Sequence, residues 1–412
     1  MRLSVASPSS IDLGRLLPSF VALDVLMMPF VGLSVLTFSM PIVILWVLRS
    51  FMSFGSQKDF IVAVLVLFLS LLSFIYALVF GEKNGSLDGQ MVEVWRITLM
   101  NFGLFSLLIL YFLYFRFNSR LNTGHLSSIL LWYVILNLLL VTVYYSNHHL
   151  YFTIRTFWTL SSSPLEVGEF SSITRFTGIM SDPNNLAVAM VAVLAMILLN
   201  KSISLFLRYV LVLVVILIVA AGMSKSGLLA LIVASLAYIL YSISRKINVL
   251  QFLSAIIFIV FIMAFFVQYK NELDVVNFYL ERIESSTLND GRLNTLNYYL
   301  DPSNIIDHLI LGQGGAVFID GVIARPHLGF FYIMYNYGLM ALIGFLYIIF
   351  LKPNAVGYIY YLPIYILFIG FFINSGLQDY RFLVLLALLS GVLRRSNLGR
   401  CQVSSATPSS LN

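Results

Sequence analysis

Runs of about 20 apolar residues recur along nearly the whole chain, and they limit its fold more than any other feature. A helix of that length spans a hydrocarbon core about 30 Å thick. Because lipid offers no water to hydrogen-bond with the backbone, spanning segments are helices or closed barrels. With 60% hydrophobic residues, 10% charged residues and a mean hydropathy of +0.95, the chain has too little polar surface for a water-soluble globule. We therefore predict an all-α polytopic integral membrane protein.

Hydropathy predicts the membrane spans but does not decide whether residues 16–48 cross once or twice. Asp24, Pro29 and Pro41 interrupt residues 16–48. Because proline removes a helical donor, this region is expected to cross either once as a long tilted helix or twice as a broken pair. We expect one transmembrane domain over residues 1–412 with about 11–12 helices, since the spans leave no room for a separate soluble domain. The other predicted spans lie near 60–80, 97–117, 126–146, 183–200, 205–222, 226–243, 249–269, 327–351, 357–375 and 380–394.

The distribution of charge predicts the orientation of the chain. Basic residues cluster in alternate connections, and the positive-inside rule assigns these connections and the C-terminus to the cytoplasm. The opposite face then receives a smaller loop over 147–182 and a large loop over 270–326. The large loop carries four basic and eight acidic residues, as expected of an extracytoplasmic segment. The basic residues assigned to the cytoplasm are Arg49, Lys58, Arg116, Arg120, Lys201, Arg208, Arg245, Lys246, Lys352, Arg394, Arg395 and Arg400.

Several classes of chemistry find no support in the composition. The single cysteine, Cys401, lies in the polar C-terminal tail, so no internal disulfide is expected. His148 and His149 lack neighbours with metal-ligand spacing, so we expect no metal. Cytoplasmic loops explain most of the net charge of +6, and no nucleic-acid partner is expected. The N-terminus lacks a secretory signal, so no processing is expected.

The first candidate site is Arg175-Phe-Thr-Gly178 followed by Asp182-Pro183-Asn184-Asn185, which ends a loop and opens a helix. Asp182 is typical of an N-cap and Pro183 of the first helical position, and a well-formed helix start explains both. A helix N-terminus also presents amide donors and a positive dipole end. With further donors from Arg175 and the two asparagines, the segment suits a diphosphate.

The second candidate is Gly222-Met-Ser224-Lys225-Ser226-Gly227, a short connection between two apolar spans. A lysine at a helix end commonly extends into the membrane interface, which is one explanation of Lys225. The flanking serines and glycines would also let a phosphate oxygen approach closely. Lys225 is therefore a candidate ligand for the diphosphate.

Two further candidates lie within and after the large loop. Arg292 follows a turn, and Leu311-Gly312-Gln313-Gly314-Gly315 predicts another tight turn rather than a nucleotide fingerprint. Arg325-Pro326-His327 then leads into a helix rich in tyrosine, which also fits an interfacial aromatic belt. A neutral His327 would serve as a general base toward a sugar hydroxyl, while arginines hold a leaving diphosphate.

The last candidate is Gln378-Asp379-Tyr380-Arg381, between the last two spans. We expect Asp379 and Arg381 to pair locally or to cap the final helix.

Taken together, these motifs resemble the O-antigen polymerase and O-antigen ligase superfamily of bacterial envelope polysaccharide assembly, over roughly residues 170–351. Arg175 to Gly178 and Asp182 to Ala187 are similar to that family's arginine and asparagine-rich helix start. Residues 224–230 resemble its Ser-Arg-Gly motif, with Lys225 in the arginine position. Arg292 with the glycine turn, and His327 with Gly338 eleven residues later, resemble the remaining motifs.

The resemblance implies a fold similar to metal-independent GT-C-type membrane glycosyltransferases. It also implies an undecaprenyl-diphosphate-linked oligosaccharide as donor, transfer to an acceptor hydroxyl at the periplasmic face of the inner membrane, and no cofactor. The expected partners are membrane lipid and the chain-length regulator and flippase of the same pathway. His327 and Arg175 would be catalytic, and Lys225, Arg292, Arg325, Asn184 and Asn185 would bind the diphosphate.

A polysaccharide polymerase is the function we expect, and three alternatives stay open. An O-antigen ligase would differ in its acceptor, the lipid A core. A permease or lipid-linked glycan flippase would need ionisable residues buried at mid-bilayer, and the sequence shows no inverted repeat of the kind found in many transporters. A non-enzymatic scaffold would tolerate alanine at the basic loop residues.

Overall fold

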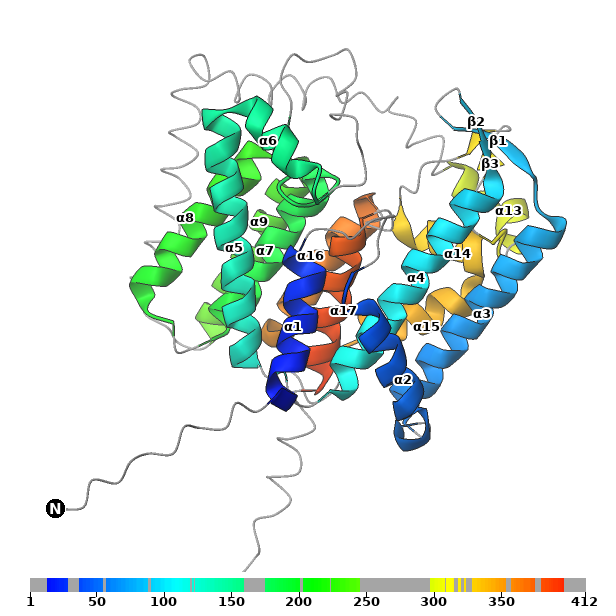
Figure 1. Cartoon of the computed structure of the whole chain (residues 1–412), viewed down its shortest axis with the longest axis horizontal. Helices are drawn as coiled ribbons and strands as arrows, with labels where there is room; N and C mark the ends of the chain where they lie inside the picture. The colour runs from blue at the N-terminus through cyan, green and yellow to red at the C-terminus, as the bar shows by residue number, and fades with distance from the viewer. Residues whose placement is uncertain are drawn as a thin grey trace, which may run out of the picture.

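The protein is mostly helical (Figure 1). The computed structural model describes residues 13–28, 37–54, 57–87, 90–118, 121, 123–158, 175–200, 203–222, 224–244, 297–307, 309–314, 318–319, 322–323, 328–352, 357–374 and 379–395. Its helices are α1 Leu13–Met27, α2 Met40–Phe54, α3 Lys58–Phe80, α4 Val94–Phe117, α5 Thr123–Ser146, α6 His148–Arg155, α7 Pro183–Leu198, α8 Leu205–Ala221, α9 Lys225–Ser244, α13 Pro302–Asp307, α14 Gly329–Tyr337, α15 Leu339–Ile349, α16 Tyr358–Asn374 and α17 Tyr380–Arg395. Its strands are β1 Asn84–Leu87, β2 Gln90–Glu93, β3 Phe318–Ile319 and β4 Val322–Ile323.

Three helices of the described chain are long and apolar enough to cross a membrane. They are α3, α4 and α5, with 23, 24 and 24 residues. The other apolar helices are shorter: α7 has 16 residues and α8 has 17, which at 1.5 Å per residue is roughly 25 Å. These features support a helical membrane protein, whereas the number of crossings and the orientation stay predictions. The predicted span at 249–269 lies outside the described residues.

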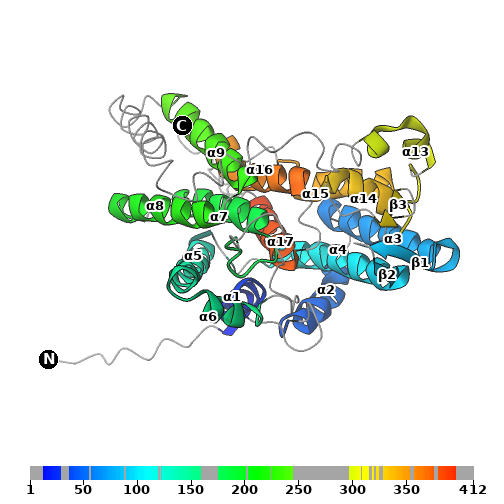
Figure 2. The same ribbon diagram turned by 90° about the horizontal axis from the view of Figure 1, so that it is seen from above.

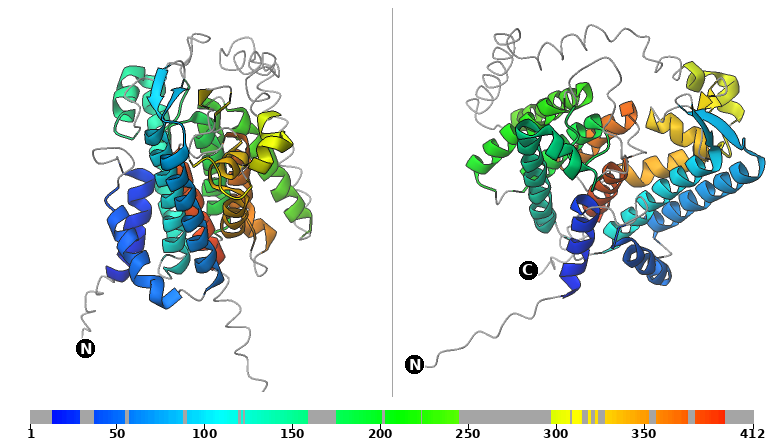
Figure 3. Two further views of the ribbon diagram at one scale, coloured as in Figure 1. Left: turned by 90° about the vertical axis from the view of Figure 1, so that its right-hand side faces the viewer. Right: turned by 45° about the horizontal axis from the view of Figure 1, so that its top comes forward.

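The ambiguous region 16–48 contains two helices rather than one long helix. α1 and α2 each have 15 residues. They lie on one side of α3 and α4, and α14 to α16 lie on the other side (Figure 3). The broken pair is thus the arrangement that the structure adopts.

The predicted continuous helix over 327–351 is wrong within residues 328–351, because the chain breaks at Gly338 between α14 and α15. Gly338 has a φ of +87°, and a Cβ there would lie 2.3 Å from the carbonyl oxygen of Ile310. The segment 309–314 packs against the break. Gln313 N donates to the Tyr335 oxygen at 2.6 Å, and Leu339 N donates to the Leu309 oxygen at 2.9 Å. Backbone groups freed by the break therefore find partners within the protein, as an apolar environment requires.

A small sheet, which the sequence did not predict, joins two segments far apart in the chain. Its strand order is β2-β1-β4-β3, with β1 antiparallel to β2 and Ser86 paired in parallel with Val322. The strands have two to four residues, too few for a periodic pattern to be recognised. The sheet connects residues 81–96 to the predicted large loop.

The helix α17 lies at the centre of the bundle, beside α4, α7 and α16 (Figure 2). Residues Tyr380 to Arg394 of α17 are all buried. A helix that is buried on every side is a core element. Its first turn approaches the segment before α7, which carries the first candidate site.

Candidate functional site

The first two candidate motifs meet where three helix ends come together. Phe176 N donates to the oxygen of Ala221 at 3.2 Å, which ties the segment before α7 to the end of α8. The half-buried Arg175 donates from Nε to the Gly222 oxygen at 3.0 Å and from Nη2 to Oδ1 of Asn184 at 3.1 Å. Arg175 therefore links the C-terminus of α8 to the first turn of α7.

The Asn184 amide oxygen joins the first motif to the second. It also accepts from the Ser224 hydroxyl at 2.9 Å. Ser224 Oγ lies 3.0 Å from Ser226 Oγ and accepts from Gly227 N at 3.0 Å, so it caps α9. Lys225 follows Ser224 directly in the chain, at the first position of α9, and is half-buried. We call Arg175, Asn184, Ser224 and Lys225 the Arg175 cluster.

The predicted N-cap at Asp182 is confirmed, and it occupies backbone amides at the start of α7. Asp182 Oδ1 accepts from Asn184 N at 2.7 Å and from Asn185 N at 3.1 Å, and Pro183 has no N–H to offer. These amides of α7 are thus engaged by a side chain, contrary to our expectation that they would bind a diphosphate. The positive dipole ends of α7 and α9 still point into the cluster, and side chains supply the donors.

Two glycines let the elements of the site approach each other. A Cβ at Gly227 would lie 2.4 Å from Cβ of Ala187, so only glycine lets the first turns of α9 and α7 pack this closely. Gly178 has a φ of +56°, and a Cβ there would lie 2.2 Å from Oδ1 of Asn137. Both positions therefore require glycine for a steric reason.

Asp379 fixes the segment that carries Arg175. Its Oδ2 accepts from N and Oγ of Ser181, both at 3.0 Å, and its Oδ1 accepts from the first amides of α17, Arg381 N at 3.1 Å and Phe382 N at 3.3 Å. Asp379 is buried, and desolvation raises the pKa of its carboxyl above 3.8 despite the hydrogen bonds from Ser181. The predicted capping role is confirmed, and the link to Ser181 is an addition.

Arg381 has a structural role at another helix end. It is buried and donates to the carbonyl oxygens of Leu26 at 2.9 Å and Met28 at 2.8 Å, at the C-terminus of α1. A cation at that end of a helix is favourable. The expected capping of the final helix is therefore made by Asp379, while Arg381 caps α1.

The sequence did not indicate two side chains of α6 that hydrogen-bond to the segment before α7. Arg155, at the end of α6, is buried and donates from Nη2 to the Ser181 oxygen at 3.4 Å. The Tyr151 hydroxyl accepts from Thr177 N at 3.1 Å. An arginine and a tyrosine four residues apart in a short amphipathic helix were the available signal, but nothing in the sequence pairs them with residues 177 and 181.

The structure brings together some of the predicted ligands and not others. Arg175, Asn184 and Lys225 lie in the Arg175 cluster. Asn185 is buried, at 5% exposure, and its Oδ1 has no hydrogen-bond partner among the described residues. A free acceptor does not suit an anion, so the expectation for Asn185 gains no support. The predicted residues outside the described part of the chain are Arg292, Arg325 and His327.

The residues that the structure describes contain no group of three or more His, Cys, Asp or Glu side chains arranged to hold a metal ion. Comparison with protein-family models and with curated proteins found no match.

Proposed function

We propose that this protein is a polysaccharide polymerase, which transfers an undecaprenyl-diphosphate-linked glycan chain onto a lipid-linked repeat unit at the periplasmic face of the bacterial inner membrane. One observation carries the proposal: the Asn184 amide joins Arg175 to Ser224, with Lys225 beside them, where three helix ends meet. Two cationic side chains beside the positive ends of α7 and α9 suit a diphosphate.

The chemistry of transfer assigns a task to each group. The acceptor hydroxyl oxygen attacks the anomeric carbon of the donor, and the bond from that carbon to the diphosphate oxygen breaks. Arg175 and Lys225 stabilise the negative charge that develops on the departing diphosphate. The acceptor proton passes to a general base, for which the sequence offers His327. Arg292 and Arg325 are further diphosphate ligands that the family resemblance implies.

The contacts of Arg175 favour such a role because they fix its guanidinium in advance. Two of its nitrogens are held by the Gly222 carbonyl and the Asn184 amide oxygen. The segment behind it is tied to α17 through Ser181 and Asp379. A donor that is already oriented loses little entropy when it binds an anion, and this preorganisation strengthens electrostatic stabilisation.

Reconstitution of the purified protein tests the proposal. The lipid-diphosphate-linked repeat unit is supplied without added metal, and the products are separated on a gel. We expect a ladder of lengthening glycans that is lost in Arg175→Ala and in His327→Ala. Arg208→Ala is the matched control, because Arg208 also donates to backbone carbonyls but at the opposite end of α8. A full ladder from Arg175→Ala would contradict the proposal.

The same assay separates the polymerase from the ligase. A ligase would give no ladder with the authentic donor alone, and would add a single glycan when lipid A core is supplied as acceptor. The diphosphate-binding cluster would serve both enzymes, so the product decides between them.

A permease or flippase is a second candidate because one carboxylate is buried among helices. Asp24 is 1% exposed, and its Oδ2 accepts from Ser39 N at 2.7 Å. Hydroxyl groups of Thr37, Tyr111 and Tyr380 form a chain beside it. A buried ionisable residue of this kind is expected along an ion or substrate path. Movement of labelled lipid-linked glycan across proteoliposomes without elongation, abolished in Asp24→Asn, would favour this function.

A further inference from the structure

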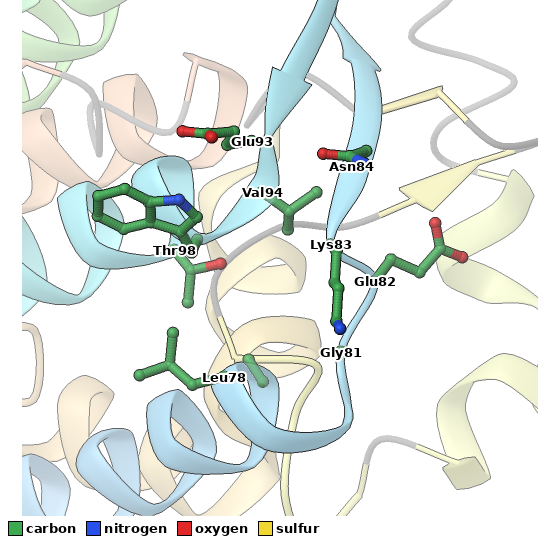
Figure 4. Close-up of a pocket in the computed structure, with 10 residues that line it drawn as sticks. Leu78, Gly81, Glu82, Lys83, Asn84, Glu93, Val94 and Thr98 are labelled. Carbon is green, nitrogen blue, oxygen red and sulfur yellow. The ribbon is translucent and has the colours of Figure 1, made fainter.

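A groove lies where the β1–β2 hairpin leaves the bundle, away from the Arg175 cluster. The end of α3, the start of β1, the end of β2 and the start of α4 form its walls, and its volume is about 340 Å³ (Figure 4). Small-molecule sites occupy about 300–1,000 Å³, so the groove suits a small polar ligand or one part of a larger one. The lining residues are Ala77, Leu78, Gly81, Glu82, Lys83, Asn84, Glu93, Val94, Trp95 and Thr98.

Polar side chains of different kinds line this groove. Figure 4 shows Glu93 and Asn84 on the two strands of the hairpin, with Lys83 and Thr98 between them and Leu78. Together they offer a carboxylate, an amide, an amine and a hydroxyl. Such a set both donates and accepts hydrogen bonds, so it can satisfy a ligand that carries several hydroxyl groups.

Trp95 adds an aromatic surface to the groove. Its side chain is 48% exposed, and the Arg96 guanidinium lies 5.6 Å from its ring centroid. An indole combines a large apolar face with an N–H donor. Pyranose rings present C–H groups that pack on such a face and hydroxyls that bind to neighbouring polar groups. An aromatic ring beside carboxylate and amide groups is therefore suited to a carbohydrate.

The charge of the groove argues against a phosphate ligand. Glu82 and Glu93 line it together with one cation, Lys83. Arg96 is paired with Glu93, with 2.7 Å between Nε and Oε2. The groove thus differs from the Arg175 cluster, where cations and helix dipoles favour an anion. A neutral or weakly charged sugar fits this balance better than a diphosphate.

The groove also adjoins β4 and the segment 309–314. β1 pairs with β4 through Ser86 and Val322, and His327 follows the end of β4 by four residues in sequence. A Cβ at Gly314 would lie 2.4 Å from Cβ of Ala77, so the glycine turn of the same segment packs behind the groove wall. A sugar in the groove would therefore lie near β4 and the glycine turn of residues 309–314.

We propose that this groove is a subsite for a sugar residue of the acceptor glycan, with Trp95 as the stacking surface and Glu93 and Asn84 as the groups that bind hydroxyls. The inference rests on the proposed function for its ligand class, since a polymerase must also bind sugars of the acceptor repeat unit other than the one that reacts. The two sites lie on different helices and are well separated (Figure 3). Their ligands can therefore be tested independently.

Calorimetry on the protein in lipid nanodiscs tests the groove with two probes. The first is a mixture of oligosaccharides released by mild acid from the surface polysaccharide of the source cells, and the second is inorganic pyrophosphate. We expect Trp95→Ala to bind the oligosaccharides at least about tenfold more weakly than wild type. Trp132→Ala, which removes a 61% exposed tryptophan from α5, is the matched control and should bind like wild type.

The outcomes separate the groove from the function on which it rests. Weaker oligosaccharide binding in Trp95→Ala, with unchanged pyrophosphate binding, supports the subsite. Equal binding by Trp95→Ala and Trp132→Ala overturns it, and so does the absence of oligosaccharide binding to wild type at millimolar concentration. Arg175→Ala should lose pyrophosphate binding and keep oligosaccharide binding. If Arg175→Ala binds pyrophosphate like wild type, the result counts against the proposed function. The oligosaccharide measurements would still decide whether the groove binds sugar.

Discussion

Two groups of charged residues join helix ends in this protein, and they do so in different ways. In one, Asp59 lies 2.8 Å from Nε of Arg116 and 3.1 Å from Nη2 of Arg394, and all three residues are buried. In the Arg175 cluster, the arginine hydrogen-bonds to a carbonyl and to a side-chain amide. The first group is an ion triad in the interior, whereas the hydrogen bonds of the second join the C-terminus of α8 to the first turn of α7 and the start of α9.

The two groups differ in the partners of their arginines. Arg394 donates to carbonyl oxygens at the end of α15 and to Asp59, so its charge is matched by a carboxylate and a negative dipole end. Arg175 donates to the Gly222 carbonyl at the C-terminus of α8 and to the Asn184 amide oxygen in the first turn of α7. The proposed function requires that the Arg175 cluster accept an anion, whereas the triad already contains a carboxylate.

The largest expected effect is that of Asp59→Asn. Loss of the carboxylate leaves Arg116 and Arg394 buried without their counter-ion, which we expect to destabilise the protein by about 3–5 kcal/mol. Unfolding in detergent, followed by tryptophan fluorescence, measures the change. A variant as stable as wild type would show that the helix-end carbonyls alone compensate both arginines.

Gly227→Ala is expected to have the next largest effect. The added Cβ would lie 2.4 Å from Cβ of Ala187 and force α9 away from α7, at a cost of about 1–3 kcal/mol. Elongation should fall as well, because the Arg175 cluster spans both helices. Gly103→Ala is the matched control: a Cβ there meets nothing within 4 Å, so the substitution should be neutral or stabilise α4 by up to about 1 kcal/mol. Equal effects of both variants would contradict the close approach.

The sequence predicted well those features that depend on neighbouring residues. Asp182 followed by Pro183 predicted where α7 begins, and the apolar runs predicted α3, α4 and α5 to within about three residues at each end. Both depend on local rules, capping chemistry and the length of apolar segments. Arg175, Asn184 and Lys225 were likewise selected by residue type and by their place at helix ends.

The sequence did not predict features that depend on distant partners. The break at Gly338 depends on the carbonyl of Ile310, which lies 28 residues earlier in the chain. The attachment of Ser181 to Asp379 spans 198 residues. Arg116 and Arg394 were interpreted as charges that mark a face of the membrane, yet they are buried in the triad. Single-sequence patterns carry no information on such pairings.

A smaller effect is expected from Asp379→Asn, and it depends on pH. Burial raises the pKa of Asp379 in the folded protein above 3.8. The folded state therefore binds the proton more tightly than the unfolded state, and the resulting stability is present at low pH and is lost as pH rises through the folded pKa. The wild-type midpoint of thermal unfolding should fall relative to that of the variant as the pH rises above about 4. Parallel pH profiles for the two proteins would contradict the raised pKa.

The smallest effect is expected from Glu93→Gln, which removes an exposed ion pair. Its loss of stability can be compared with that of Asp59→Asn, which removes the carboxylate of the buried triad. Glu93 and Arg96 lie 2.7 Å apart, closer than either pair of the triad, but their side chains are 50% and 71% exposed. Because water screens this pair, its loss should cost no more than about 1 kcal/mol. Molar salt should remove that difference, since the screening length is then about 3 Å, whereas the effect of Asp59→Asn should persist because ions do not reach the buried triad. Equal salt sensitivity of the two variants would mean that solvent reaches Asp59, and the contrast between a buried triad and an exposed ion pair would then be lost.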